Sequence, residues 1–166
     1  MEQDINTEIK DNNVHNNGMI HFILSHSYIV FLMAIILGVI FDVIYRISIF
    51  SNPIYQNIGF IMIILGSIII YWSQSTSRCI KKNTEQDIIY NFECGPYKYS
   101  RNPTHIGIAI MTLGFGFIVN ALFIIIFIII AYFITGLIFL KEEERLLEQK
   151  YGQKYLDYKK KVKIWL

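Results

Sequence analysis

Three long stretches without a charged residue constrain this chain more than any other feature. Asp, Glu, Lys and Arg are absent from Asn12 to Phe41, from Ile47 to Ser77 and from Asn102 to Leu140, which are runs of 30, 31 and 39 residues. About 20 apolar residues suffice for a helix to cross a bilayer. Charged residues make up 17% of the chain, against about 25% in soluble domains. The pattern predicts an integral membrane protein and excludes a soluble enzyme, a disordered tail and a nucleic-acid-binding protein.

The first two runs each predict one membrane-spanning helix in an all-α fold. These helices are expected over residues 22–45 and 54–72, and Pro53 stands at a natural helix start before the second. Asp42 and Arg46 lie at helical i, i+4 spacing near the end of the first helix. Oppositely charged side chains at this spacing and depth are expected to form an ion pair at modest cost.

The third run predicts a helical hairpin. As a single helix it would be about 58 Å long, nearly twice the hydrocarbon thickness, so it must fold back. Gly114, Gly116 and Asn120 supply a break near its middle. The expected arms are residues 104–118 and 121–140, which brings the total to about four transmembrane helices.

The distribution of basic residues predicts which side of the membrane each loop faces. The loop at 73–103 and the tail from Lys141 carry net positive charge, whereas residues 1–21 form a polar, acidic tail. Basic segments beside spans tend to stay cytoplasmic, so the loop and the C-terminal tail should face the cytoplasm. The N-terminal tail lacks the basic start of a secretory signal. Residues 22–166 are therefore expected to form a single membrane domain with both termini in the cytoplasm.

The C-terminal tail predicts an amphipathic helix over residues 142–162. Its apolar and aromatic residues recur every three or four positions, and lysines lie opposite them. A basic, tyrosine-rich helix next to a span is expected on the cytoplasmic membrane surface. The residues of this face are Leu147, Tyr151, Tyr155, Tyr158 and Val162.

Two polar clusters bracket the hairpin. One is the turn from Gly95 to Gly107, which includes Arg101 and His105, and the other is Glu142–Glu144. Because the ends of a hairpin lie side by side, the two clusters should meet at one membrane interface. Simpler roles stay open: the arginine as a phospholipid headgroup contact, the glutamates as helix caps, and the histidine as a hydrogen-bonding residue at a helix end.

The two clusters resemble a known family. The turn from Gly95 to Gly107 is similar to the Gly-x-Tyr…Arg-His-Pro-x-Tyr-x-Gly signature of isoprenylcysteine carboxyl methyltransferases and the related phospholipid methyltransferases. The tail resembles the family pattern Glu-Glu-x-x-Leu-x-x-x-Phe-Gly-x-x-Tyr-x-x-Tyr-x-x-x-Val, with Tyr151 in place of Phe. The resemblance covers roughly Ile89 to the C-terminus. It implies an integral membrane methyltransferase that uses S-adenosylmethionine on a lipid or prenylated small-molecule acceptor, with its site facing the cytoplasm.

The resemblance also implies site residues. Arg101 and His105 are the candidate catalytic residues, and neither a metal site nor an obligate protein partner is expected. Asn102 stands in place of the family's His, and His105 in place of Tyr. Phe139 stands where the prenylcysteine enzymes are expected to carry an Arg that binds the substrate carboxylate. The implied cofactor-binding residues are Ile89, Tyr90, Asn91, Phe92, Tyr97, Asn102, Pro103, Thr104, His105, Glu143 and Glu144.

Three alternatives to an isoprenylcysteine-type methyltransferase remain open at this point. One is a phospholipid (ethanolamine) N-methyltransferase, in which His105 would be the nearest side chain suited to deprotonating an amine. Another is an NADPH-dependent enzyme similar to the membrane sterol reductases, which share an Arg-His-Pro-like segment and a tyrosine-rich tail. The third is a membrane scaffold that has lost activity.

Overall fold

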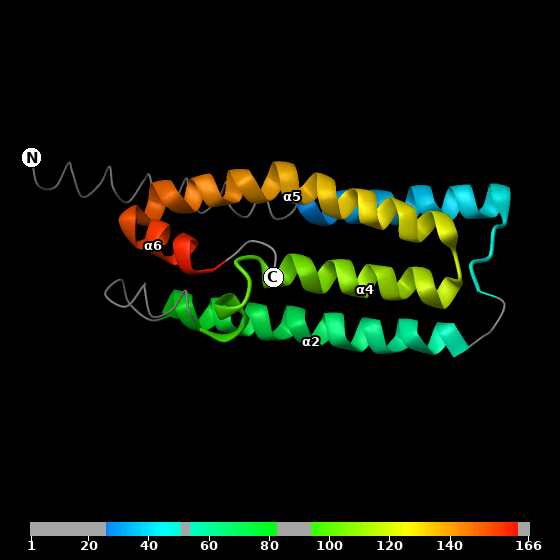
Figure 1. Ribbon diagram of the computed structural model, residues 1–166, viewed down its shortest axis with the longest axis horizontal. Coiled ribbons are helices and arrows are strands. Elements are labelled where there is room, and N and C mark those ends of the chain that lie inside the picture. Colours follow the sequence, from blue (N-terminus) through cyan, green and yellow to red (C-terminus); the bar gives the residue numbers. More distant parts are fainter. Residues whose placement is uncertain (1–25, 51–53, 83–93, 163–166) are drawn as a thin grey trace, which may run out of the picture.

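The computed structural model describes residues 26–50, 54–82 and 94–162, and it is built from helices (Figure 1). Each long helix runs antiparallel to the long helix that follows it in the chain. The described residues contain one isolated bridge, between Ser48 and Ala121, and no strand. The all-α class is therefore confirmed. The elements are a first helix at His26–Tyr45, α2 at Ile54–Lys82, the 3₁₀ helix η1 at Gly95–Lys98, α4 at Pro103–Val119, α5 at Leu122–Tyr151 and α6 at Gln153–Lys161.

The longest charge-free run folds back as a hairpin of α4 and α5, as its length predicts. The turn falls at Asn120, whose left-handed backbone (φ 57°, ψ 42°) ends α4. Helices commonly end at such a residue, and Asn tolerates the conformation better than most. Asn120 Oδ1 also accepts hydrogen bonds from the backbone N–H groups of Ile49 and Phe50, at 3.1 and 2.9 Å. One side chain thus fastens the hairpin turn to the loop after the first helix.

Four glycines allow α2 and α4 to approach each other closely. Gly59 and Gly66 of α2 face Gly114 and Gly107 of α4, respectively. A Cβ atom added at Gly59 or Gly66 would lie 2.5 or 2.6 Å from a carbonyl oxygen of the facing helix. Helices in membranes associate through such close packing of small residues. Gly114 therefore belongs to this interface, and the hairpin turn lies at Asn120 instead.

The first helix packs against α5, and its Asp42 caps that helix. The Asp42 carboxylate accepts hydrogen bonds from the backbone N–H groups of Phe123 and Ile124, at 3.4 and 3.2 Å. A carboxylate there satisfies donors that have no partner within the helix, and it interacts favourably with the helix dipole. The expected ion pair with Arg46 is not formed, because the Asp42 carboxylate is held by α5. The Arg46 side chain has no partner among the described residues.

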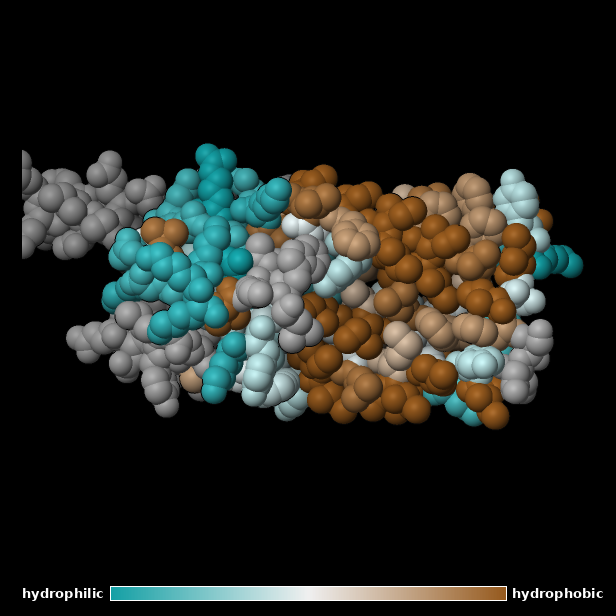
Figure 2. Space-filling model, viewed as in Figure 1, coloured by the Kyte–Doolittle hydropathy of each residue, from teal (hydrophilic) through white to brown (hydrophobic). Residues whose placement is uncertain are grey.

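The surface of the bundle is apolar over most of its length, and polar residues gather at one end (Figure 2). Three helices are long and apolar enough to cross a membrane, namely His26–Tyr45, Ile54–Ser77 and Leu122–Tyr151. α4 is also apolar but has only 17 residues, which is about 25 Å of helix. The integral membrane class is confirmed, and the count of four crossings stays a prediction.

The C-terminal region differs from the single tail helix expected over residues 142–162. α5 continues without a break to Tyr151, because the residues after Leu140 are mostly strong helix formers such as Lys, Glu, Arg and Leu. The break falls at Gly152 (φ 57°, ψ −134°), a conformation that only glycine adopts readily. α6 then folds back, and its Tyr155 and Tyr158 pack inside the protein rather than on a membrane surface.

Parts of the expected organisation lie outside the described residues. These parts are the N-terminal tail at 1–21, the first turn of the expected first span at 22–25, and residues 83–93 of the predicted loop. The part of that loop nearest the membrane is helical, because α2 continues past the predicted end at Trp72 to Lys82.

Candidate functional site

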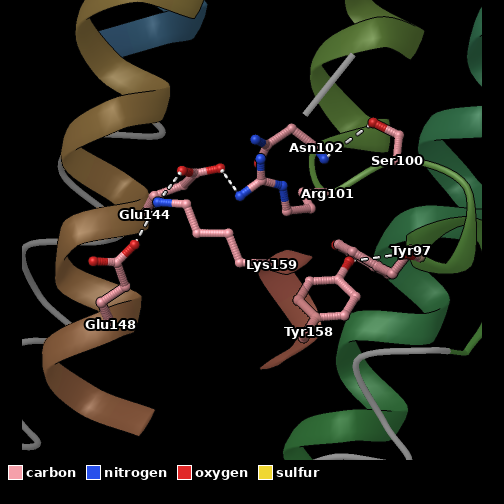
Figure 3. Close-up of polar contacts among 8 residues, drawn as sticks. All are labelled: Tyr97, Ser100, Arg101, Asn102, Glu144, Glu148, Tyr158 and Lys159. Carbon is pink, nitrogen blue, oxygen red and sulfur yellow. Dashed lines mark hydrogen bonds and ion pairs between the residues drawn. The ribbon is translucent and has the colours of Figure 1, made fainter. Parts of the chain in front are cut away.

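The two ends of the hairpin meet at the polar end of the bundle, as the sequence predicts. Arg101 lies just before α4, and its Nη1 is 2.7 Å from Glu144 Oε1 on α5 (Figure 3). Both side chains are buried, with 8% and 6% of their surface exposed. Buried opposite charges depend strongly on each other, because either one alone would be left without solvation. The pair therefore fixes the turn before α4 against α5.

α6 brings a second cation to this pair. Lys159 Nζ lies 3.0 Å from Glu144 Oε2 and also contacts Glu148, one turn further along α5 (Figure 3). The hydrogen bond to Glu148, followed by the one to Glu144, raises the pKa of Lys159, so its ammonium stays charged. Tyr158 holds the same helix from another side, since its hydroxyl donates to the Tyr97 carbonyl oxygen at 2.7 Å. α6 therefore closes one side of a group of charged residues that we call the polar cluster, namely Arg101, Glu143, Glu144, Glu148 and Lys159.

Glu143 differs from its neighbour because it has no ion-pair or hydrogen-bond partner among the described residues. It is half-buried and lies beyond Leu140, where the charge-free part of α5 ends. Burial, followed by the charge of Glu144, raises the pKa of Glu143 to about 7. Its charge also reaches the hydroxyls of Tyr28 on the first helix and Tyr155 on α6. A desolvated and unpaired carboxylate is a natural acceptor for a cationic ligand group.

Four hydroxyl groups join α2, η1 and the start of α4. The fully buried Ser73 Oγ donates to Tyr97 OH at 3.1 Å and lies 2.5 Å from Thr104 Oγ1. The Tyr97 hydroxyl also lies 2.6 Å from Ser77 Oγ. Hydroxyls that find partners in this way can be buried at low cost, and a satisfied network makes the local structure rigid. The network directs the Tyr97 hydroxyl toward α2 and holds η1 in place.

The start of α4 presents a free amide. Pro103 occupies the first turn of α4, where its missing N–H costs nothing. The carbonyl oxygen of Asn102 accepts the N–H groups of His105 and Ile106, at 3.2 and 3.4 Å. The Asn102 side chain caps nothing and makes no hydrogen bond within the described residues, so its amide is available to a ligand. The predicted cofactor-binding residues Ile89–Phe92 lie outside the described residues.

His105 is not part of the polar cluster. Its ring is 5% exposed, and its Nε2 lies 2.6 Å from Thr135 Oγ1. The ring packs between Phe31 and Tyr132, at centroid distances of 5.3 and 6.0 Å. Thr135 precedes Glu143 by eight residues, which is about 12 Å along a helix. The structure therefore places His105 deeper in the bundle, as a hydrogen-bonded core residue, and its catalytic role stays a prediction.

One buried polar atom of the cluster has no partner. Arg101 Nε is buried and makes no hydrogen bond in the described part of the chain. An unmet buried donor costs about 1–3 kcal/mol, so a ligand, a water molecule or strain usually accounts for it. The Glu143 carboxylate, the Asn102 amide and this N–H are three polar groups of the site without a hydrogen-bond partner among the described residues. The set suits a small ligand that carries charges of both signs.

Sequence reasoning missed several residues that build the cluster. Ser73 and Ser77 stand at i, i+4 spacing after the apolar part of α2, a pattern that puts two hydroxyls on one helix face. Lys159 follows Tyr155 at the same spacing on α6, whereas the tail pattern places the lysines opposite the aromatic face. Only the fold shows that Gly152 turns this face inward, because the reversal depends on a single glycine. Tyr28 at the start of the first helix carried no signal that separated it from a membrane-interface tyrosine.

A comparison with known families identifies the chain. The family model described as phospholipid methyltransferase matches residues 54–154, which is more than half of the 166 residues. The chain belongs to the phospholipid methyltransferase family. The matched part of this family member includes α2, η1, α4 and α5, and thus Arg101, Glu143 and Glu144, whereas the first helix and most of α6 lie outside it. No curated protein and no solved structure matches the chain.

Family membership and the apolar helices together indicate a membrane methyltransferase that acts on lipid-type substrates. The matched segment ends at Lys154, so Lys159 and Tyr158 are additions that the structure makes to the site of this phospholipid methyltransferase homologue.

Proposed function

We propose that the protein transfers a methyl group from S-adenosylmethionine to a lipid acceptor at the polar end of the bundle. The unpaired, desolvated carboxylate of Glu143 carries this proposal. The cofactor's amino-acid part has an ammonium and a carboxylate, which fit the Glu143 carboxylate and the Arg101 N–H, respectively. The Asn102 amide is suited to a hydroxyl or a ring nitrogen of the adenosine. Bound there, the cofactor supplies a methyl group made electrophilic by its sulfonium.

The protein's other contribution is to position the cofactor's methyl group and the acceptor. Tyr28 and Tyr155 lie near Glu143, and tyrosine rings attract cations by about 1–2 kcal/mol when desolvated. α6 packs against the cluster through Lys159 and Tyr158. In-line displacement needs the acceptor and the methyl group held in register, and orientation alone can contribute several powers of ten in rate. The basic flanks of the polar end favour a cytoplasmic site.

The charge of the cluster favours a phospholipid amine over a prenylcysteine carboxylate as the acceptor. Three carboxylates, those of Glu143, Glu144 and Glu148, face two cations, Arg101 and Lys159. Both cations are already paired with glutamates, and the cofactor's carboxylate takes the remaining Arg101 N–H, so no cation is left for a substrate carboxylate. Phe139, where a carboxylate-reading Arg is expected in the prenylcysteine enzymes, instead stacks on His26, with the ring centroids 6.3 Å apart.

A binding experiment tests the cofactor assignment. Calorimetry of the purified protein in detergent should show S-adenosylmethionine binding that weakens at least about tenfold in Glu143→Gln, since a charge-assisted hydrogen bond contributes about 1.5–3 kcal/mol. Glu142→Gln is the matched control, because Glu142 is exposed and its ion pair within the described residues is a surface contact with Arg145, at 3.7 Å. Equal affinity in both variants, or no binding to the unmodified protein, would reject the assignment.

A labelled-methyl assay tests the acceptor. Phosphatidylethanolamine should gain label from S-adenosylmethionine, and farnesylcysteine should not. Labelling of farnesylcysteine alone would reverse the acceptor assignment while leaving methyl transfer intact. Cofactor binding without labelling of any lipid extract would indicate a protein without methyltransferase activity. NADPH binding in place of S-adenosylmethionine would favour a reductase.

A further inference from the structure

The end of the bundle opposite the polar cluster contains a cavity. Its volume is about 510 Å³, and it lies between the end of the first helix, the start of α2 and the hairpin turn. The wall is apolar where Val43, Ile47 and Ile124 line it, and polar where Asp42, Arg46 and Gln56 line it. A cavity with one apolar wall and one polar wall suits an amphipathic ligand.

The charges at this end leave one cation unpaired. Asp42 and Arg46 are the only charged residues between Asp11 and Arg78, and the hairpin from Asn102 to Leu140 has none. The Asp42 carboxylate is held by the N-terminal N–H groups of α5. The exposed Arg46 side chain has no partner among the described residues. Within the described residues, Arg46 is therefore an unpaired guanidinium between an apolar wall and the carboxylate of Asp42, which α5 holds.

The backbone of Arg46 is also unusual. Its φ is 47°, a left-handed conformation that costs a residue with a side chain about 1–2 kcal/mol. Its N–H donates to the Asp42 carbonyl oxygen at 2.8 Å, so it ends the first helix where Gly or Asn is usual. An arginine held in this conformation at the edge of a cavity points to a use for its side chain.

The aromatic residues locate this cavity at a membrane interface. Tyr45 and Tyr55 lie at this end, and Tyr71 and Trp72 lie exposed further along α2, ten residues or more before it ends at Lys82. Tyr and Trp concentrate at the two edges of the hydrocarbon layer. Tyr55 and Tyr71 are 16 residues apart, about 24 Å along a helix, which is close to one hydrocarbon thickness. Arg46 therefore lies at the level of lipid headgroups.

We propose that this cavity binds an anionic phospholipid. Arg46 contacts the headgroup phosphate, since a guanidinium matches phosphate oxygens in geometry and charge. Gln56 donates to the phosphate or to an ester oxygen. One acyl chain lies along Val43 and Ile47. The site is at the opposite end of the bundle from the polar cluster, and it does not rest on the proposed methyl transfer.

Native mass spectrometry of the detergent-solubilised protein, with phosphatidylglycerol and phosphatidylcholine as competing probes, tests the proposal. The unmodified protein should bind phosphatidylglycerol preferentially, and Arg46→Gln should reduce this preference about tenfold. Lys154→Gln is the control, because this exposed lysine lies at the other end of the bundle, and it should leave the preference unchanged. An equal loss in both variants would show charge attraction without a site and would overturn the proposal.

A second variant tests the proposal independently, in case Arg46→Gln fails to fold. Val43→Trp fills the cavity from an exposed position and keeps the guanidinium, and it should also lose phosphatidylglycerol. Arg46→Lys should retain part of the preference. Full binding in Val43→Trp would overturn the proposal, as would displacement of the lipid by inorganic phosphate at an equal concentration, because the apolar wall would then contribute nothing.

Discussion

Arg101 and Glu144 are 43 residues apart in the chain and form a buried ion pair at 2.7 Å, with Lys159 on the other carboxylate oxygen at 3.0 Å. The arrangement is asymmetric. Glu144 has two cationic partners, whereas the Arg101 guanidinium has one carboxylate partner in the described part of the chain. The two residues should therefore respond differently to substitution.

Removing Glu144 should destabilise the protein more than removing Arg101. Glu144→Gln leaves Arg101 buried without its counter-ion, which costs about 3–5 kcal/mol. Arg101→Gln leaves Glu144 paired with Lys159 and should cost about half as much. Thermal unfolding in detergent measures both values. Equal losses would mean that Lys159 contributes nothing to the solvation of Glu144.

Cofactor affinity should rise with pH through the ionisation of Glu143. Burial and then Glu144 raise the pKa of this carboxyl to about 7, so it is mostly protonated below that pH and accepts an ammonium only weakly. Affinity for S-adenosylmethionine should increase about fifteenfold between pH 5.5 and 7, since the ionised fraction of a group with a pKa of about 7 rises from about 3% to about 50% over this range. Calorimetry across this range measures the slope, and Glu143→Gln should flatten it. A slope that persists in that variant would assign the titration to another group.

The glycine contact between α2 and α4 should not tolerate a side chain. At Gly66 a Cβ would lie 2.6 Å from the Gly107 carbonyl oxygen, so Gly66→Ala must push the helices apart. Overpacking of this kind costs about 1–3 kcal/mol. Ile68→Ala is the control on the same helix, because Ile68 is 55% exposed on the outer face. Thermal unfolding should show a clear loss for Gly66→Ala and a small one for Ile68→Ala.

Gly152 should be required for its backbone conformation and not because a side chain would clash there. An added Cβ would meet nothing within 4 Å, yet the φ of 57° disfavours any other residue. Gly152→Ala should cost about 1–3 kcal/mol and should loosen α6, whose Lys159 and Tyr158 contact the cluster. Limited proteolysis after Lys159 should become faster, and cofactor affinity should fall. An unchanged cleavage rate would mean that α6 holds its position without the turn.

The sequence predicted the architecture because each charge-free run corresponds to one or two membrane-spanning helices. The hairpin follows because the third run is nearly twice as long as one helix that crosses the bilayer. It also predicted that Arg101 would meet the glutamates, since hairpin ends must be neighbours. The resemblance implied a cofactor role for Glu143 and Glu144, but which carboxylate faces Arg101 could not be predicted, because this depends on the rotation of α5. The hydroxyl network of Ser73 and Tyr97 could not be predicted, since it joins three elements through tertiary contacts alone.

The tail shows a different limit. Periodicity identified the tyrosine face correctly, but a single residue, Gly152, decides whether that face meets lipid or protein. His105 also depends on tertiary contacts. The polar motif around it suggests a catalytic histidine, whereas in the fold its Nε2 bonds to Thr135, which lies 30 positions later in the chain.

α5 is one uninterrupted rod of 30 residues, about 45 Å long. Its first turn is capped by Asp42 at one bilayer face, and its glutamates stand beyond the other face. Helices respond to a thinner or thicker bilayer by tilting, and a rigid rod that tilts moves both of its ends. A bilayer whose thickness tilts this rod would therefore change the spacing between Glu143 and the groups around it.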